Sequence, residues 1–142
     1  MTLTRFIGLD PGERRIGVAL SDTLGIIAQP HLVIDRRSGD AIAAIRDLCI
    51  EYEVDTVVVG LPRNLKGEEG PSAAMARELA SAVAAATGCH IAFSDERFTT
   101  VQAEAALIEG GMRRRKRRET IDKVAAAVML QGFLDGRSSH DA

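Results

Sequence analysis

The chain has 142 residues, of which 46% are hydrophobic and 27% charged, and its formal net charge is -2. This length suits one domain with a single core, and the composition is that of a globular protein rather than a disordered one. No apolar run approaches the roughly 18 residues of a membrane span, and no export signal opens the chain. We therefore expect a cytoplasmic protein with no membrane partner, folded as one domain over residues 1–136 with a flexible tail over 137–142.

Three extended segments open the chain, over Arg5–Leu9, Arg15–Ser21 and His31–Asp35. The turn residues Pro11-Gly12 follow the first segment, and a second turn lies around Asp22–Gly25. Strands joined by turns this short predict an antiparallel meander.

The hydrophobic period then changes. Apolar residues from Ile42 to Cys49 recur at helical spacing, and residues 56–61 (TVVVGL) form the continuous apolar run typical of a strand covered on both faces. The remaining pattern predicts a helix over Ser72–Ala86, a strand over 90–95, a helix over Thr100–Glu109 and a last helix over Ile121–Leu134. The sequence therefore predicts a mixed sheet with helices on its faces.

Three carboxylates stand out by their setting. Asp10 ends the first strand, and Glu96 follows the strand over 90–95, directly after Asp95. Asp122 shares a helical stripe with the apolar residues Ala126 and Met129, so it is predicted to face the core. Each also has a simpler interpretation: Asp10 as a turn former, Glu96 as a solvated loop acid, and Asp122 as an acid favoured by the helix dipole.

If the three carboxylates converge, they meet at one edge of the sheet. Clustered carboxylates repel one another unless a cation lies between them, and Mg²⁺ prefers oxygen ligands. Asp10, Glu96 and Asp122 are therefore candidate ligands for divalent cations, and two such ions can hydrolyse a phosphodiester bond.

Four stretches of sequence occur in order up to Leu134: GLDPGERRIGVALSD, VVVGLPRNLKGEEGP, DERFTTVQA and IDKVAAAVMLQGFL. Together they resemble the YqgF (RuvX) family of pre-16S ribosomal RNA nucleases, which are also similar to Holliday junction resolvases. The resemblance implies an α/β, RNase H-like fold with a five-stranded mixed β-sheet flanked by α-helices. It places the family's acidic positions at Asp10, Glu96 and Asp122, and so selects Glu96 over Asp95. Arg14 stands where the family usually has lysine, which keeps the charge.

The resemblance also implies a chemistry. We expect a metal-dependent nuclease that uses Mg²⁺ or Mn²⁺, with two ions, in processing the 5′ end of pre-16S ribosomal RNA. Nucleic acid is then the main partner, ribosomal particles are further candidates, and the chain is a monomer or a homodimer. The alternative substrate is branched DNA, cut by a Holliday junction resolvase.

A basic run over Arg113–Arg118 precedes Asp122, and we expect it to form a loop that holds phosphates. A second loop, over 61–70, has two interpretations: a plain surface loop, or a mobile loop over the site that brings Asn64 and Lys66 near the substrate. Aromatic residues make up 4% of the chain, so recognition by base stacking is not supported. The complete set of predicted nucleic-acid-binding residues is Arg14, Arg15, Asn64, Lys66, Arg97, Thr99, Thr100, Arg113, Arg114, Arg115, Lys116, Arg117 and Arg118.

Two functions from other classes compete with a nuclease. Actin-like and sugar-kinase-like proteins place an Asp-x-Gly turn against ATP phosphates after their first strand, as Asp10-Pro11-Gly12 could do here, but they need two such lobes. A non-catalytic RNA-binding module would keep the basic run and would not need all three acids. A nucleotide-binding P-loop is not favoured, because residues 60–70 lack the GxxxxGK[ST] pattern and no helix is predicted directly after the lysine.

Overall fold

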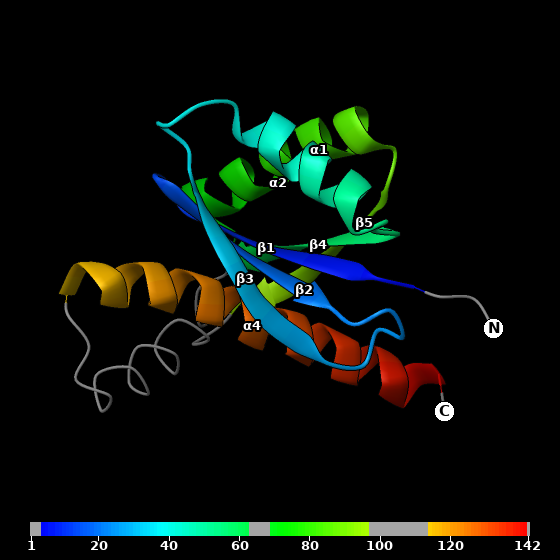
Figure 1. Cartoon of the computed structure of the whole chain (residues 1–142). Helices are drawn as coiled ribbons and strands as arrows, with labels where there is room; N and C mark the ends of the chain where they lie inside the picture. The colour runs from blue at the N-terminus through cyan, green and yellow to red at the C-terminus, as the bar shows by residue number, and fades with distance from the viewer. Residues whose placement is uncertain (1–3, 63–68, 97–113, 142) are drawn as a thin grey trace.

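The computed structural model describes residues 4–62, 69–96 and 114–141 of the chain (Figure 1). Its elements are β1 (Phe6–Pro11), β2 (Arg15–Ser21), β3 (Ala28–Asp35), α1 (Ala41–Glu51), β4 (Thr56–Pro62), α2 (Pro71–Thr87), β5 (His90–Glu96) and α4 (Arg114–Asp141). Each lies where the sequence predicted an element of that type, and the predicted helix over Thr100–Glu109 falls outside the described residues.

The strands form one mixed sheet in the order β3-β2-β1-β4-β5. β2 is antiparallel to both β1 and β3, which confirms the predicted meander. β4 is parallel to β1, and β5 is parallel to β4. The carboxyl ends of β1, β4 and β5 therefore meet at one end of the sheet, where ligands bind in open α/β sheets.

Helices α1 and α2 cover one face of the sheet, and α4 runs across the other (Figure 1). We call these the α1–α2 face and the α4 face. Side chains alternate along a strand, so each central strand contributes to both faces. In β1, Ile7 and Leu9 belong to the core under α1 and α2, whereas Phe6 belongs to the core with Leu130 of α4.

Local signals set the helix ends. The side chain of Asp40 caps α1 by accepting a hydrogen bond from the backbone amide of Ala43 at 3.1 Å. Helix α2 begins at Pro71, whose missing N–H costs nothing in a first turn, and ends at Gly88 in the left-handed conformation with φ 72°.

The predicted bounds of the last helix were wrong at both ends. α4 extends from Arg114 to Asp141, so residues 114–118, expected as a loop, and residues 137–141, expected as a loose tail, have helical backbone. Arg and Lys are strong helix formers, so the basic run continues directly into the apolar stripe without a break. At the other end, the guanidinium of Arg137 lies 4.8 Å from the centre of the Phe6 ring. This cation–π contact holds the part of α4 that follows Gly136 against β1.

The chain has two cysteines, Cys49 and Cys89. Cys49 is buried, and that burial raises the pKa of its thiol to about 12, so the reactive thiolate is scarce at neutral pH. Cys89 is only half-buried. In the part of the chain that the structure describes, no helix has the length and hydropathy needed to span a membrane.

Candidate active site

Asp10 lies one residue before the end of β1, and its side chain is partly exposed. The alternation along β1 places it on the α4 face with Phe6 and Gly8. Phe6 packs in the core beneath α4, and a Cβ atom on Gly8 would lie 2.9 Å from Cβ of Leu130. The carboxylate therefore stands between the sheet and α4, at the end of the sheet where the parallel strands stop.

Helix α4 crosses β2 at Gly17, the residue that pairs with Asp10 across the β1–β2 ladder. A Cβ atom on Gly17 would overlap the backbone carbonyl oxygen of Asp122, so only glycine lets the helix lie this close to the strand. Residues opposite each other in an antiparallel pair face the same side of the sheet. The contact at Gly17 thus brings Asp122 to the same part of the α4 face as Asp10.

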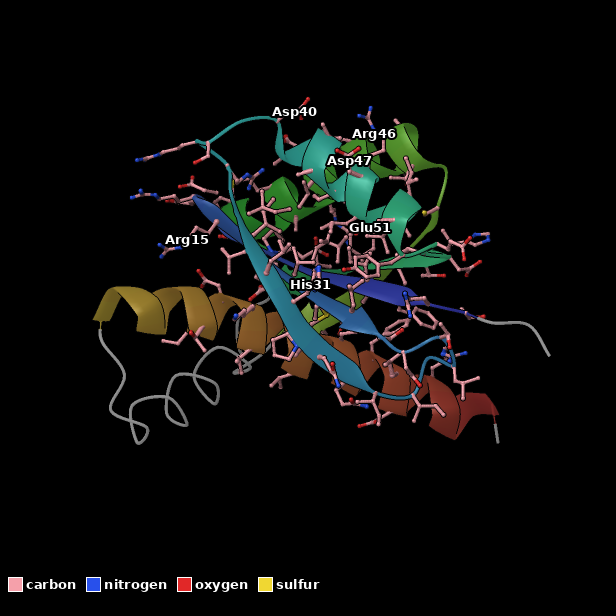
Figure 2. The ribbon with its side chains drawn as sticks, in the orientation of Figure 1. Arg15, His31, Asp40, Arg46, Asp47 and Glu51 are labelled. Carbon is pink, nitrogen blue, oxygen red and sulfur yellow. The ribbon has the colours of Figure 1, made fainter. Side chains whose placement is uncertain are left out.

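Arg15, two residues before Gly17 on the same strand, binds Asp122 directly. Its Nε donates a hydrogen bond to Oδ2 of Asp122 at 2.9 Å, and the two side chains are 28% and 30% exposed. Figure 2 shows Arg15 at the end of the sheet where α4 begins. Ion pairs this exposed contribute about 0–1 kcal/mol to stability, so the contact mainly orients the Asp122 carboxylate.

Glu96 is the last residue of β5, and its backbone pairs with Pro62 of β4. The register places it two strands across the sheet from Asp10 and two residues further toward the carboxyl ends. With strands about 4.8 Å apart and a rise of about 3.3 Å per residue, the Cα atoms of Asp10 and Glu96 lie on the order of 12 Å apart. Two carboxyl side chains can span such a distance when they share a pair of cations. The side chain of Glu96 lies outside the described residues.

The neighbouring acid, Asp95, occupies a position on the opposite face of the sheet. It pairs with Leu61, a member of the core beneath α1 and α2. The alternating set of β5 positions, which includes Ala92 and Glu96, is the set that faces α4, because Ala92 packs in that core. Of the two adjacent acids, only Glu96 occupies a strand position that faces the same side of the sheet as Asp10.

Comparison with known proteins shows the family to which the chain belongs. A family model described as "RuvX: Holliday junction resolvase" matches residues 4–136. The chain belongs to the RuvX family. A relative from Moorella thermoacetica is 48% identical over 132 residues, covering 92% of this chain and 94% of the relative. One from Clostridium botulinum (strain Alaska E43 / Type E3) is 44% identical over 132 residues, covering 92% and 96%. Both carry the name "Putative pre-16S rRNA nuclease".

Among solved structures, the chain is similar to Thermus thermophilus RuvC in complex with a Holliday junction substrate. The TM-score is 0.60 and the sequence identity 18%, over 96% of both chains. This similarity shows that the RuvX chain has the RNase H-like fold, which the family resemblance implied.

The donor atoms at this site fit a hard divalent cation. Asp10 and Asp122 supply carboxylate oxygens, the ligands that Mg²⁺ and Mn²⁺ prefer, and the Arg15 guanidinium already holds a positive charge against Asp122. Among the described side chains, no three His, Cys, Asp or Glu residues lie close enough to share a metal ion. The third predicted ligand of this RuvX chain, Glu96, is not among those side chains.

The predicted nucleic-acid-binding residues are only partly described. Arg14 Nε lies 4.0 Å from Oδ2 of Asp35, and both Arg14 and Arg15 line a pocket of about 350 Å³ beside the site. The side chains of Arg114, Arg115, Lys116, Arg117 and Arg118 on α4 lie outside the described residues. So do the whole residues Asn64, Lys66, Arg97, Thr99, Thr100 and Arg113.

Sequence reasoning overlooked two cations at this end of the sheet. Lys123 lines the same pocket as Arg14 and Arg15. Arg36 supports the turn after Asp10, because its NH1 donates a hydrogen bond to the carbonyl oxygen of Gly12 at 2.8 Å. A signal for Lys123 was present, since it directly follows Asp122. The signal for Arg36 was its position directly after the third strand, because an antiparallel meander places the end of β3 beside the β1–β2 turn.

Proposed function

We propose that this protein is a metal-dependent nuclease that hydrolyses phosphodiester bonds at the 5′ end of pre-16S ribosomal RNA, in the cytoplasm. The proposal is supported by the close approach of the Asp122 backbone to Gly17, the residue that pairs with Asp10 near the end of β1, in a chain of the RuvX family. The names of relatives that match over most of their length support ribosomal RNA as the substrate. Ribosomal particles are the setting in which we propose that this RNA is bound.

In this proposal Asp10, Glu96 and Asp122 hold two Mg²⁺ or Mn²⁺ ions. Such a pair, when bound, supplies activation of the attacking water and stabilisation of the leaving oxygen. Arg15 is a positioning residue, because its hydrogen bond fixes the rotamer of the Asp122 carboxylate.

Substrate binding is assigned to cations rather than to aromatic stacking. Arg14 and Arg15 contact phosphates near the reacting bond, and the basic residues 113–118 contact phosphates further along the strand. Asn64, Lys66, Arg97, Thr99 and Thr100 complete the proposed set. Contacts of this kind fix the register of a nucleic acid without reading its sequence, so the selection of a cleavage position depends on the shape of the RNA.

The test is a cleavage assay on end-labelled pre-16S RNA, with Mg²⁺, Mn²⁺ or EDTA. We expect cleavage with either ion and none with EDTA. Asp122→Asn removes a proposed metal ligand and should abolish cleavage. Asp47→Asn is the matched control, because Asp47 is an exposed acid of α1 on the other side of the sheet (Figure 2). Cleavage that persists in EDTA, or an Asp122→Asn variant as active as Asp47→Asn, would contradict the proposal.

A Holliday junction resolvase is the second candidate, favoured by the description of the matching family. The same assay on a four-way DNA junction separates the two, because a resolvase cuts two strands and needs two active sites in a homodimer. Symmetric cleavage of the junction by a dimeric species, with pre-16S RNA left intact, would select the resolvase.

A further inference from the structure

A cationic pocket of about 350 Å³ lies between the β2–β3 hairpin and α4, next to the candidate active site. Arg14, Arg15 and Lys123 line it together with His31 and Asp35. Arg15 pairs with Asp35 of β3, four residues after His31, so the pocket follows the strands for some distance. It therefore extends from the candidate site toward the edge strand β3.

The three cations of this pocket are not equally engaged. Arg15 binds Asp122 at 2.9 Å, and Arg14 Nε lies 4.0 Å from Asp35, at the limit of an ion pair. Lys123 makes no hydrogen bond or ion pair with any side chain that the structure describes. Asp35 is the counter-charge: the backbone amide of Arg37 is the main cause of its lowered pKa, and the nearby Arg14 adds to it. The pocket thus retains an excess of positive charge.

Lys123 and Asp122 are consecutive on α4, and consecutive helical residues point about 100° apart. Asp122 lies against Gly17 of β2, whereas Lys123 lines the pocket with Leu32 and Val33 of β3. The helix therefore holds a candidate metal ligand and a cation at a fixed separation.

The dimensions suit a nucleic-acid backbone. Strand β3 lies two strand spacings from β1, which is about 10 Å. At a rise of about 3.4 Å per nucleotide, a strand that passes Asp10 reaches the pocket within about three nucleotides. Phosphate oxygens accept hydrogen bonds from the arginine fork and the lysine ammonium alike.

We propose that Lys123 and Arg14 form a phosphate subsite that holds the substrate backbone on the β3 side of the scissile bond. This proposal rests on the nuclease function proposed above and adds the direction in which the strand leaves the site. On that side of the scissile bond, the substrate then runs along the β2–β3 hairpin, away from β4 and β5. Lys123 is a positioning residue: it strengthens substrate binding and fixes the position of the substrate backbone relative to the candidate site.

The experiment uses the Asp10→Asn chain, so that the substrate survives, and a single-stranded RNA that contains the cleavage position. We expect Lys123→Ala to weaken binding roughly 10-fold. The slope of log K against log[salt] should fall by about 0.7, the value for one phosphate contact on a single strand. Lys123→Arg should restore both. Arg46→Ala on α1, which removes an exposed arginine from the other side of the molecule, is the control and should change neither (Figure 2).

A second measurement locates the contact. RNAs that each carry one neutral methylphosphonate are titrated against the Asp10→Asn chain and its Lys123→Ala form. One position within about three nucleotides of the cut should lower affinity in the first chain and have no further effect in the second. Equal salt slopes for Lys123→Ala and Arg46→Ala, or additive losses at every position, would overturn the subsite.

These outcomes are distinct from failure of the proposed function. If the protein cleaves RNA but Lys123→Ala leaves RNA binding unchanged, the subsite is contradicted and the proposed function still holds. If the chain neither binds nor cuts RNA, the titrations are repeated on a four-way junction, where the expected slope change is about 0.9. Absence of binding to both substrates would overturn both proposals.

Discussion

The two faces of the sheet are built from alternate residues of the same strands and differ in composition. The α1–α2 face is lined by large aliphatic side chains, among them Leu9, Val57 and Val59, which are fully buried. On the α4 face, β1 carries Gly8 and β2 carries Gly17, and the helix approaches the backbone closely. Both faces bury apolar side chains, and the α4 face also carries the charged groups of the candidate site.

This difference shows how one short strand can serve stability and chemistry together. Leu9 and Asp10 are adjacent in the chain, but they face opposite sides because side chains alternate along a strand. Substitutions at neighbouring positions should therefore have separable effects. The following four predictions test that separation.

Leu9→Ala should have the largest effect on stability. It removes a fully buried side chain from the α1–α2 face and should lower the free energy of unfolding by about 2–5 kcal/mol. Urea titration measures the loss. Cleavage per folded molecule, assayed in the absence of urea at low temperature, should stay within a few-fold of the parent, and a much larger drop would show that the two faces are coupled.

Asp10→Asn should have the opposite profile. The substitution removes one carboxylate charge from a partly exposed position, so we expect little change in unfolding and at least about a 100-fold loss of cleavage, because even groups that only support metal ligands contribute 10–100-fold. A Tb³⁺ or Mn²⁺ binding titration gives a readout independent of cleavage and should show weakened binding. Metal affinity equal to that of the parent would remove Asp10 from the ligand set.

Gly17→Ala should lower both the stability of the protein and its cleavage activity. The new methyl group overlaps the carbonyl oxygen of Asp122, so α4 must shift away from β2, at a cost of about 1–3 kcal/mol. Cleavage should fall with it, since Asp122 moves with the helix. Gly132→Ala on α4 is the control: nothing lies within 4 Å of the added atom, and removing a helical glycine should stabilise the protein by about 0.5–1 kcal/mol. Equal effects of the two substitutions would contradict the close approach at Gly17.

The smallest effect is expected at Asp22, at the end of the sheet away from the candidate site. Burial raises the pKa of Asp22, but hydrogen bonds from the amides of Ile27 and Ile26 outweigh burial and lower the pKa below 3.8. The charged form is therefore favoured in the folded state, so its contribution to stability is present above the unfolded pKa and is lost as the pH falls below it. Asp22→Asn keeps an acceptor oxygen and removes the charge. The stability difference between parent and variant should shrink between about pH 5 and pH 2, and a constant difference would show that the charge has no role.

Much of the candidate site could be proposed from the sequence because its signals are local. A charge at the end of an apolar strand identifies Asp10 from a few neighbouring residues. Asp122 is identified by the helical stripe that it shares with Ala126 and Met129, both of which are buried beneath the sheet. Neighbouring residues do not distinguish Glu96 from Asp95. Two consecutive acids face opposite sides of a strand, and only the pairing of that strand shows which acid faces which side of the sheet. Pairing of β5 with β4 and packing of Ala92 against α4 decide which strand position faces Asp10's side of the sheet.

The sequence by itself determined the order and type of the described elements, because hydrophobic period and turn residues are properties of short segments. It did not determine where α4 begins and ends, because a run of helix-forming cations and a tail containing Gly136 have no strong stop signal until Arg137 docks on Phe6. It also did not reveal the ion pair of Arg15 with Asp122 or the pocket that Lys123 lines. Those residues are more than a hundred positions apart along the chain, and only the close approach of α4 to Gly17 brings them together.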